Sequence, residues 1–382
     1  MKFKISVSDL QYAMRLVRDV VPSTAVLLEN TGVLIEATDN RATFTAFNSE
    51  VMVKAVVHIE GSQNGVAVVD AQSLYNAISR FQPRNAKGEG TSDISINSNP
   101  KTRKLTVSAK TRYSSGSETP HRRVFSLRNP ELFPDFSIVP EGREFKLPAV
   151  KLMDGLDSVS YATASDKNTF VFTGVYVKLA DSLLTLAATD GICLAEYEVA
   201  VDYTGEPIDF IIPSSLATKI AKSFFDEDIL NVCVTERSLN ISTPNLMLGG
   251  TLIREQYPDY KAVVPQPTEF AVLDKHVLTD NLLNLSYEAS TVPDNRVSVV
   301  FENGEASLRC GQSENGGLKT DFEKNVKFDS NLKLLALSVK NVVGNDVKIG
   351  FSGEGKPLHF FSTGQLPTGA KFSCMLVPLT PQ

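Results

Sequence analysis

A carboxylate at a tight turn is the first candidate for chemistry in this chain. The segment LTLAATDGICLAEYEV places Asp190 in an Ala-Thr-Asp-Gly turn between two runs that resemble strands. Asp190 could act as a catalytic acid, bind a metal, or hold the turn by accepting backbone hydrogen bonds. Because Gly191 suits a left-handed turn and Thr189 and Asp190 bond readily to nearby backbone, we interpret Asp190 as structural.

The other side chains that perform chemistry are dispersed along the chain. The cysteines form no Cys-x-x-Cys pair and the histidines do not cluster, so the sequence predicts neither disulfides nor a metal site, and no cofactor. No phosphate-binding, dinucleotide-binding or nucleophile-elbow motif occurs. A hydrolase using Asp190 with Asp259 is the catalytic alternative, which nuclease and esterase assays would test. The dispersed residues are Cys193, Cys233, Cys310, Cys374, His58, His121, His276 and His359.

Composition indicates an ordinary cytoplasmic protein of several domains. The chain has 382 residues, 42% hydrophobic and 21% charged, which suggests roughly two to four domains. It contains no run of about 18 apolar residues and no apolar signal core at its start, so we expect no membrane partner. The net charge is −6, yet basic residues exceed acidic ones in 1–125. The basic stretch 101–123 is either a solvated hairpin or a surface that meets DNA phosphates.

The chain contains a threefold internal repeat. Segments that begin at Phe3, Phe145 and Phe270 each read as a short strand followed by a helix. Their apolar positions fall at i, i+4 and i+7, which predicts that each helix buries one face. These positions are Leu10, Met14 and Val17, then Leu152, Leu156 and Val159, then Leu278, Leu282 and Leu285.

A second helix is predicted within each repeat, and strand-like runs bounded by Gly, Asn and Asp surround it. The predicted N-caps of these helices are Asp70, Ser214 and Asp329. Two helices against antiparallel strands, given three times, predict an α+β fold. We expect three similar domains, 1–125, 126–265 and 266–382, joined by short linkers rich in proline.

Four sequence marks together resemble the bacterial β sliding clamp family, the processivity factors of replicative DNA polymerases. They are the opening MKF, the segment 184–199 quoted above, QYPDYKAVVP at 256–265, and VPL near the end. The resemblance extends over the whole chain, and the order of these marks is far more specific than any one of them.

The resemblance implies a non-catalytic protein that forms a head-to-tail homodimer ring around double-stranded DNA, with helices inside and sheets outside. Its partners would be a DNA polymerase and a clamp loader, which bind through short peptides. A weakly basic lining suits sliding better than tight phosphate binding. The loop VVPSTAVLLEN after the first helix lacks the basic residue that the family tends to carry there. The expected DNA-facing residues are Arg15, Arg18, Arg80, Arg84, Lys219, Lys222, Lys333 and Lys340.

The resemblance also implies a hydrophobic groove between the second and third domains that receives a partner peptide of the Gln-x-x-Leu-Phe type. Its expected residues are Phe172, Thr189, Gly191, Ile192, Cys193, Leu194, Pro258, Val263, Met375, Val377, Pro378 and Leu379. Ile192, Cys193, Ala262 and the ending Pro-Leu-Thr-Pro-Gln replace polar or charged groups common in the family. We therefore expect an altered peptide preference, as in a phage or divergent member.

The dimer contact is expected between the edges of the first and third domains. The candidate segments are a strand around 108–115, with Tyr113 and Ser115, and the helix end around 287–292, with Glu288 and Ala289. Glu288 and Ala289 stand where the family often has larger apolar residues, and Ser115 is polar, so we expect a dimer that dissociates more readily. The alternative is a clamp-like monomer that binds peptides without encircling DNA.

Overall fold

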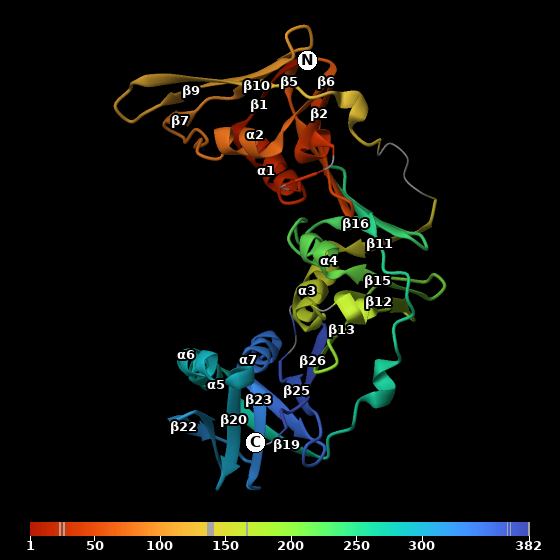
Figure 1. Ribbon diagram of the computed structural model, residues 1–382, viewed down its shortest axis with the longest axis vertical. Coiled ribbons are helices and arrows are strands. Elements are labelled where there is room, and N and C mark those ends of the chain that lie inside the picture. The colour runs from red at the N-terminus through yellow and green to blue at the C-terminus, as the bar shows by residue number, and fades with distance from the viewer. Residues whose placement is uncertain are drawn as a thin grey trace. The chain divides into compact units, whose positions relative to one another are not determined.

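The computed structural model describes residues 1–22, 24–25, 27–135, 141–165, 167–364, 366 and 368–380 (Figure 1). The chain forms two compact units. Unit 1 comprises Met1–Lys146 with Ile229–Thr251, and unit 2 comprises Leu147–Asp228 with Leu252–Gln382. The division into three domains stays a prediction, because strands from successive repeats join common sheets.

Unit 1 is built on two antiparallel sheets. Sheet A has the order β10-β9-β8-β1-β5, with β7 paired to β9, and sheet B has the order β11-β16-β17-β18-β4-β3-β2-β6. The elements are β1 (Lys2–Ile5), α1 (Val7–Arg18), η1 (Leu28–Thr31), β2 (Gly32–Thr38), β3 (Arg41–Phe47), β4 (Val51–His58), β5 (Glu60–Gln63), β6 (Gly65–Asp70), α2 (Ala71–Ile78), β7 (Gly90–Thr91), β8 (Ile94–Asn99), β9 (Lys104–Arg112), β10 (Glu118–Ser126), η2 (Pro130–Leu132), β11 (Arg143–Pro148), β16 (Ile229–Val234), β17 (Ser238–Ser242) and β18 (Leu246–Thr251).

Unit 2 repeats this plan. Sheet C has the order β15-β12-β13-β14-β26-β25-β24-β19, and sheet D has the order β22-β21-β20-β23. The elements are α3 (Ala149–Val159), η3 (Ser160–Ala162), η4 (Lys167–Thr173), β12 (Gly174–Ala180), β13 (Leu183–Thr189), β14 (Cys193–Ala200), β15 (Ile208–Pro213), α4 (Ser214–Ile220), η5 (Tyr260–Val263), β19 (Glu269–Asp274), α5 (Lys275–Asn284), α6 (Ser286–Thr291), η6 (Pro293–Asn295), β20 (Arg296–Glu302), β21 (Glu305–Cys310), β22 (Ser313–Lys319), β23 (Val326–Asn331), α7 (Leu332–Asn341), β24 (Asp346–Phe351), β25 (Leu358–Ser362) and β26 (Lys371–Leu376).

The predicted helical stripes are confirmed, and so is the α+β class. All nine stripe residues are buried, and the helices pack in pairs, α1 with α2, α3 with α4, and α5 with α7. Helix α3 also lies on β13 and β14, where Gly155 permits a close approach. A Cβ atom at Gly155 would lie 2.7 Å from Leu186 and 2.9 Å from Tyr197, so a larger residue would push the helix off sheet C.

One of the three predicted N-caps is confirmed. Asp70 caps α2 by accepting from Ser73 N. The prediction for Ser214 is wrong, because β15 runs directly into α4 and Pro213 occupies the cap position without a side-chain acceptor. The prediction for Asp329 is also wrong: Asn331 caps α7, while Asp329 lies on β23 and pairs with Arg296.

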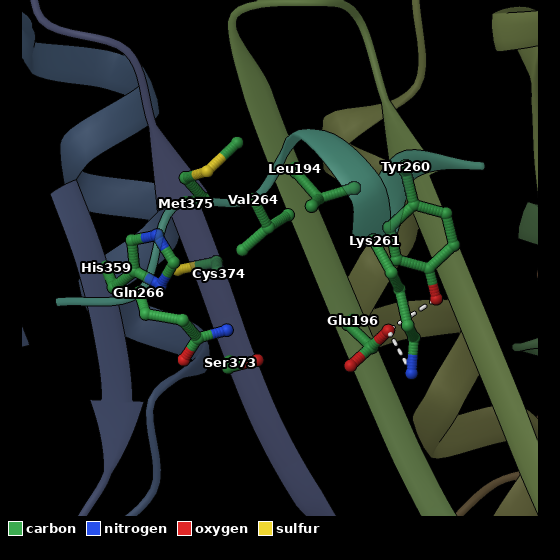
Figure 2. A pocket seen from close by; sticks show the side chains of 10 residues that line it. All are labelled: Leu194, Glu196, Tyr260, Lys261, Val264, Gln266, His359, Ser373, Cys374 and Met375. Carbon is green, nitrogen blue, oxygen red and sulfur yellow. Dashed lines mark hydrogen bonds and ion pairs between the residues drawn. The ribbon is translucent and has the colours of Figure 1, made fainter. Parts of the chain in front are cut away.

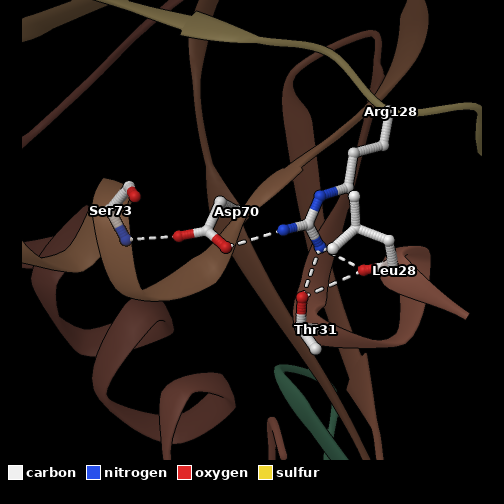
Figure 3. A network of polar contacts seen from close by, with 5 residues as sticks. All are labelled: Leu28, Thr31, Asp70, Ser73 and Arg128. Carbon is white, nitrogen blue, oxygen red and sulfur yellow. Dashed lines mark hydrogen bonds and ion pairs between the residues drawn. The ribbon is translucent and has the colours of Figure 1, made fainter. Parts of the chain in front are cut away.

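Asp70 has a second role in holding the segment that follows sheet A. Arg128 donates a hydrogen bond from Nη2 to Asp70 Oδ2 at 2.6 Å. Its Nη1 donates to Thr31 Oγ1 at 2.8 Å and to the Leu28 carbonyl (Figure 3). Partial burial would raise the pKa of Asp70, but the hydrogen bonds of Ser73 and the charge of Arg128 lower it overall. One carboxylate therefore fixes both the start of α2 and the exit from β10.

Within the described part of the chain, no helix is long and apolar enough to cross a membrane.

Candidate functional site

The Ala-Thr-Asp-Gly turn between β13 and β14 is held by its own side chains. Asp190 Oδ1 accepts from Ile192 N at 2.8 Å and from Cys193 N at 2.6 Å. Thr189 Oγ1 donates to the Cys193 carbonyl and accepts from Gly191 N. Gly191 has φ +88°, a backbone conformation that favours glycine. The geometry therefore agrees with a structural role for Asp190.

The pairing of β14 with β26 forms the floor of a pocket in unit 2. Leu194 lies opposite Met375 and Glu196 lies opposite Ser373, while His359 on β25 lies opposite Met375 from the other side. Because side chains alternate along a strand, these five residues share one face of sheet C. They line a pocket of about 180 Å³ (Figure 2).

The segment around η5 forms the opposite wall. Tyr260, Lys261, Val264 and Gln266 line the same pocket. Two polar contacts fasten this segment to the floor: the Tyr260 hydroxyl donates to Glu196 Oε2, and Lys261 Nζ lies 3.1 Å from the same oxygen (Figure 2). Lys261 also pairs with Glu198 at 3.0 Å. The half-buried phenol of Tyr260 and the ammonium group of Lys261, which two glutamates share, thus anchor the wall.

Burial and the neighbouring charges shift the pKa values of Tyr260 and Lys261. Burial, and then the negative charge of Glu196, raise the pKa of Tyr260 well above its ordinary value. For Lys261, partial burial acts to lower the pKa, but the hydrogen bonds and charges of Glu198 and Glu196 raise it overall. At neutral pH the phenol is therefore a neutral donor and the amine a cation.

An aromatic cluster supports this wall from behind. Tyr257 stacks on Tyr176 with ring centroids 4.9 Å apart and meets Tyr260 and Phe172 edge-on at 6.3 and 5.9 Å. Ile211 and Ile253 complete the buried group. Aromatic pairs of this geometry favour defined ring positions, which keeps Tyr260 at the pocket.

The C-terminal segment is attached to the turn and to sheet D. Val377 N donates to the Ile192 carbonyl at 2.8 Å, and Leu379 N donates to the Asp329 carbonyl at 2.8 Å. Arg296 bonds both Asp329 Oδ2 and the Thr380 carbonyl, at 2.7 and 2.9 Å. The predicted neighbours Ile192 and Val377 are therefore brought together.

The predicted groove residues divide into several groups. Leu194 and Met375 line the pocket, and Phe172 belongs to the aromatic cluster behind it. The prediction for Cys193 is wrong, because its side chain lies on the opposite, buried face of sheet C, 0% exposed. The others lie in the turn, near η5 or in the C-terminal segment; these are Thr189, Gly191, Ile192, Pro258, Val263, Val377, Pro378 and Leu379.

None of the polar residues that line the pocket was among the predicted groove residues. Alternation along β14 signals that Glu196 shares a face with Leu194, but no local signal places β25 beside β26. The pocket residues that were missed are Glu196, Tyr260, Lys261, Val264, Gln266, His359, Ser373 and Cys374.

The expected DNA-facing residues occupy less regular positions than the sequence indicated. Arg15 and Arg18 are exposed on α1, and the guanidinium of Arg18 lies 4.6 Å from the ring centroid of Tyr75. Helix α2 ends at Ile78, so Arg80 and Arg84 follow it in a turn and a loop. Lys222 likewise follows α4. Lys219 lies within α4, and Lys333 and Lys340 lie on α7. Contact with DNA stays a prediction.

Strand pairing corrects the proposed dimer edge. Strand β9 pairs with β8 on one side and β10 on the other, so at this end of sheet A the edge strand is β10. Tyr113 and Ser115 lie in the turn between β9 and β10. On α6, Glu288 is half-buried and Ala289 is 1% exposed, so Ala289 belongs to the core and offers no surface there. The interface itself stays a prediction.

In the described ranges, no group of three or more His, Cys, Asp or Glu side chains is arranged to hold a metal ion. The four cysteines lie in the described ranges, are buried, and form no disulfide.

The fold combines paired helices with antiparallel sheets in each unit, and unit 2 carries a pocket on the β14–β26 ladder. Family models for the N-terminal and central domains of the DNA polymerase III beta subunit match residues 1–114 and 146–259, together more than half of the chain. The chain belongs to this family, the bacterial β sliding clamps, whose members are non-catalytic processivity subunits. The resemblance seen in the sequence is confirmed.

Individual relatives are distant in sequence. The beta sliding clamp of Chlamydia pneumoniae is 24% identical over 332 residues, 85% of this chain and 84% of that protein. That of Halalkalibacterium halodurans is 26% identical over 352 residues, 86% and 87% of the two chains. A Pseudomonas aeruginosa sliding clamp bound to griselimycin covers 100% of both chains with TM-score 0.86 and 18% identity, and a Helicobacter pylori beta clamp bound to a DNA ligase peptide does so with TM-score 0.80 and 16% identity.

We expect Asp190→Ala to lower the free energy of unfolding by about 1–3 kcal/mol, because two backbone N–H groups lose a charged acceptor. The matched control is Asp259→Ala, whose exposed side chain makes no capping hydrogen bond and should cost less than about 0.5 kcal/mol. Urea unfolding of both variants provides the comparison. Equal losses would contradict the structural role of Asp190.

The raised pKa of Tyr260 predicts a loss of stability in alkali. A group whose pKa is raised on folding stabilises the fold fully below its unfolded pKa, about 10 for tyrosine, and this contribution falls as pH rises above that value. Urea midpoints at about pH 8 and pH 10.5 should therefore differ less for Tyr260→Phe than for the parent protein. Tyr287→Phe, at a residue 77% exposed, should behave like the parent. An unchanged pH dependence in Tyr260→Phe would refute this origin.

Proposed function

We propose that this chain is a DNA sliding clamp that closes as a head-to-tail homodimer around duplex DNA, without sequence preference, in the cytoplasm. It tethers a replicative DNA polymerase and other enzymes through the pocket of unit 2, and an ATP-driven clamp loader uses the same pocket. The observation that carries the proposal is the match to both clamp-family models together with a pocket formed on the β14–β26 ladder.

An acidic protein suits this role because a ring that encloses DNA does not need to bind the DNA tightly. With a net charge of −6, the chain as a whole does not attract phosphates. Strong phosphate binding would release counterions, depend steeply on salt and slow movement along DNA. Scattered basic residues such as Arg15, Lys333 and Lys340 would offset the repulsion between the duplex and the acidic protein without binding the phosphates tightly.

Two free sheet edges support the proposed ring closure. Strand β10 ends sheet A and carries exposed Arg122 and Arg123. Strand β22 ends sheet D and carries exposed Glu314, which is paired with Arg309. An edge strand presents unpaired N–H and C=O groups, so antiparallel addition of β22 from a second chain to β10 would extend both sheets. Tyr113 and Ser115 would lie at the end of this contact.

The pocket supports the tethering role. Its walls combine Leu194, Val264 and Met375 with polar groups, a composition typical of sites that take one anchoring side chain of a peptide. The clamp-like monomer that binds peptides without DNA would keep this pocket and lose the ring. The mass of the protein in solution distinguishes the dimeric ring from the clamp-like monomer.

We expect light scattering over about three decades of concentration to give a mass near twice 41.6 kDa, falling toward one chain on dilution. Clamps loaded on nicked circular DNA should be retained through gel filtration and released when the circle is linearised, because only topology holds them. A mass of one chain at every concentration would leave the monomeric alternative.

We expect a fluorescent Gln-Leu-Ser-Leu-Phe peptide to bind the pocket, and Met375→Lys to weaken binding at least about tenfold by placing a charge in its wall. The control is Leu183→Lys, a partly exposed apolar residue of unit 2 that does not line the pocket. Fluorescence anisotropy gives both dissociation constants. No saturable binding below about 1 mM would refute the assignment of the pocket.

A further inference from the structure

Strands β1, β8, β9 and β10 of sheet A have one buried side and one outward side. Side chains alternate along each strand, so buried Phe3, Ile96 and Val107 mark the inner side and their sequence neighbours point outward. The outward side carries six exposed cations, which define what we call the outer face of sheet A. They are Lys2, Lys4, Lys104, Lys110, Arg112 and Arg122.

Carboxylates do not balance these cations. On the outward side of the four strands the one acidic residue is Glu118, opposite Arg112, and Glu60 lies opposite Lys4 on the adjoining β5. None of the six cations forms an ion pair with a carboxylate in the described part of the chain. Exposed cations that serve solubility alone are normally interspersed with acidic residues. In a chain of net charge −6, six cations beside two carboxylates therefore form a local positive surface.

The register of the sheet places small polar side chains among the cations. One row across the four strands consists of Lys4, Ser95, Ser108 and Arg122 as direct neighbours. The next row has Asn97 and Thr106 on the same two central strands. Adjacent strands lie about 4.8 Å apart, so the first and last residues of the row are roughly 14 Å apart at the backbone. A strip of hydroxyl and amide groups therefore lies on β8 and β9, with positive charge on either side.

A hollow of about 610 Å³ adjoins this strip. Lys4, Ser108 and Lys110 line the hollow together with Arg84, which follows α2, and with hydroxyl groups at the start of α1. Asp93 is the one carboxylate of the lining. Arg84 also forms no ion pair with a described carboxylate. The hollow therefore extends the positive surface beyond the sheet and can admit an anionic group among three cations.

Phosphodiester groups fit this surface better than an acidic peptide does. Lysine, arginine, serine, threonine and asparagine side chains are common partners of DNA phosphates. A protein interface needs apolar or aromatic anchors, and the outward side of these strands offers only Pro120 and Val124, both on β10. No outward residue of the four strands is aromatic, so unpaired bases would find no stacking platform. The chemistry thus favours the backbone of a duplex.

We propose that the outer face of sheet A binds the phosphate backbone of duplex DNA, without sequence preference, as a contact separate from enclosure by a ring. The inference goes beyond the proposed function, since each chain carries the whole face whether or not a ring closes. The edge pairing proposed above uses backbone groups of β10 and leaves the outward side chains free. Duplex DNA bound there is a second segment that lies beside the protein.

The experiment measures binding of the parent protein to a fluorescent, covalently closed duplex circle of about 300 base pairs, roughly two persistence lengths, without clamp loader or ATP. A closed circle cannot enter a closed ring, so binding reports on a surface outside the ring. Gel retardation at several salt concentrations gives the dependence of log K on log salt. We expect a slope of about −4 to −6, because each neutralised phosphate contributes about −0.9.

The triple variant Lys4→Gln, Lys110→Gln, Arg122→Gln removes three cations from the outer face. We expect its salt slope to be less steep by about 2.7, since three phosphate contacts are lost. Its affinity for the circle at about 50 mM salt should fall at least about tenfold. All three side chains are exposed, so their replacement should leave the fold intact.

The matched control is Lys178→Gln, Arg254→Gln, Lys356→Gln, which removes the same residue types from exposed positions of unit 2 that form no ion pair with a described carboxylate. It should keep the slope of the parent protein. Equal changes in the two triple variants would overturn the inference, since the effect would then be one of net charge.

Other outcomes would overturn it without the control. No binding of the circle by the parent protein at about 50 mM salt, or a slope near zero, would show that the face does not neutralise phosphates. Tighter binding of a poly-glutamate of equal charge would assign the face to acidic peptides instead. None of these outcomes bears on ring closure, which the solution mass tests separately.

Discussion

An edge strand exposes a row of unpaired backbone groups, and this chain satisfies such edges by joining strands from successive repeats. The ladder between β14 and β26 does this in unit 2, from Cys193 opposite Leu376 to Glu198 opposite Lys371. The same pairing sets the register of the pocket floor. A slip of one residue would turn Leu194 and Met375 into the helix side of the sheet and bring Cys193 to the surface, so the site depends on one register.

The ladder alone gives a flat floor, and the wall comes from a segment with little regular structure. Segment 257–266 contains only the short η5, so its position depends on the contacts of Tyr257 with Tyr176 and of Tyr260 and Lys261 with Glu196. The half-buried phenol of Tyr260 needs the Glu196 carboxylate as its acceptor, and Lys261 lies beside the same carboxylate oxygen. The wall and the floor therefore stabilise each other.

The sequence predicted what depends on local periodicity or on a motif. Three helices were predicted because apolar residues recur at helical spacing from Leu10, Leu152 and Leu278. Leu194 and Met375 were predicted because they lie in or next to segments that resemble the clamp family. The failures have physical causes. Cys193 is adjacent to Leu194 in sequence but opposite to it across the sheet, and Ala289 is buried where exposure was expected. His359 was noted only as one of four scattered histidines, since the pairing that places it at the pocket joins residues far apart in the chain.

The charged and polar side chains of the site are distributed unevenly between its surroundings and its interior. Ile192, 48% exposed, and exposed Ala262 carry no charge, so these two side chains would give a peptide little polar guidance. Polar groups are instead gathered on the floor and far wall, at Glu196, Lys261 and His359. A hydrogen bond made in a buried position discriminates more strongly than one made at a hydrated rim, because the wrong ligand leaves a desolvated group unpaired. We therefore expect the peptide specificity of this clamp to depend on the polar groups inside the pocket more than on its rim.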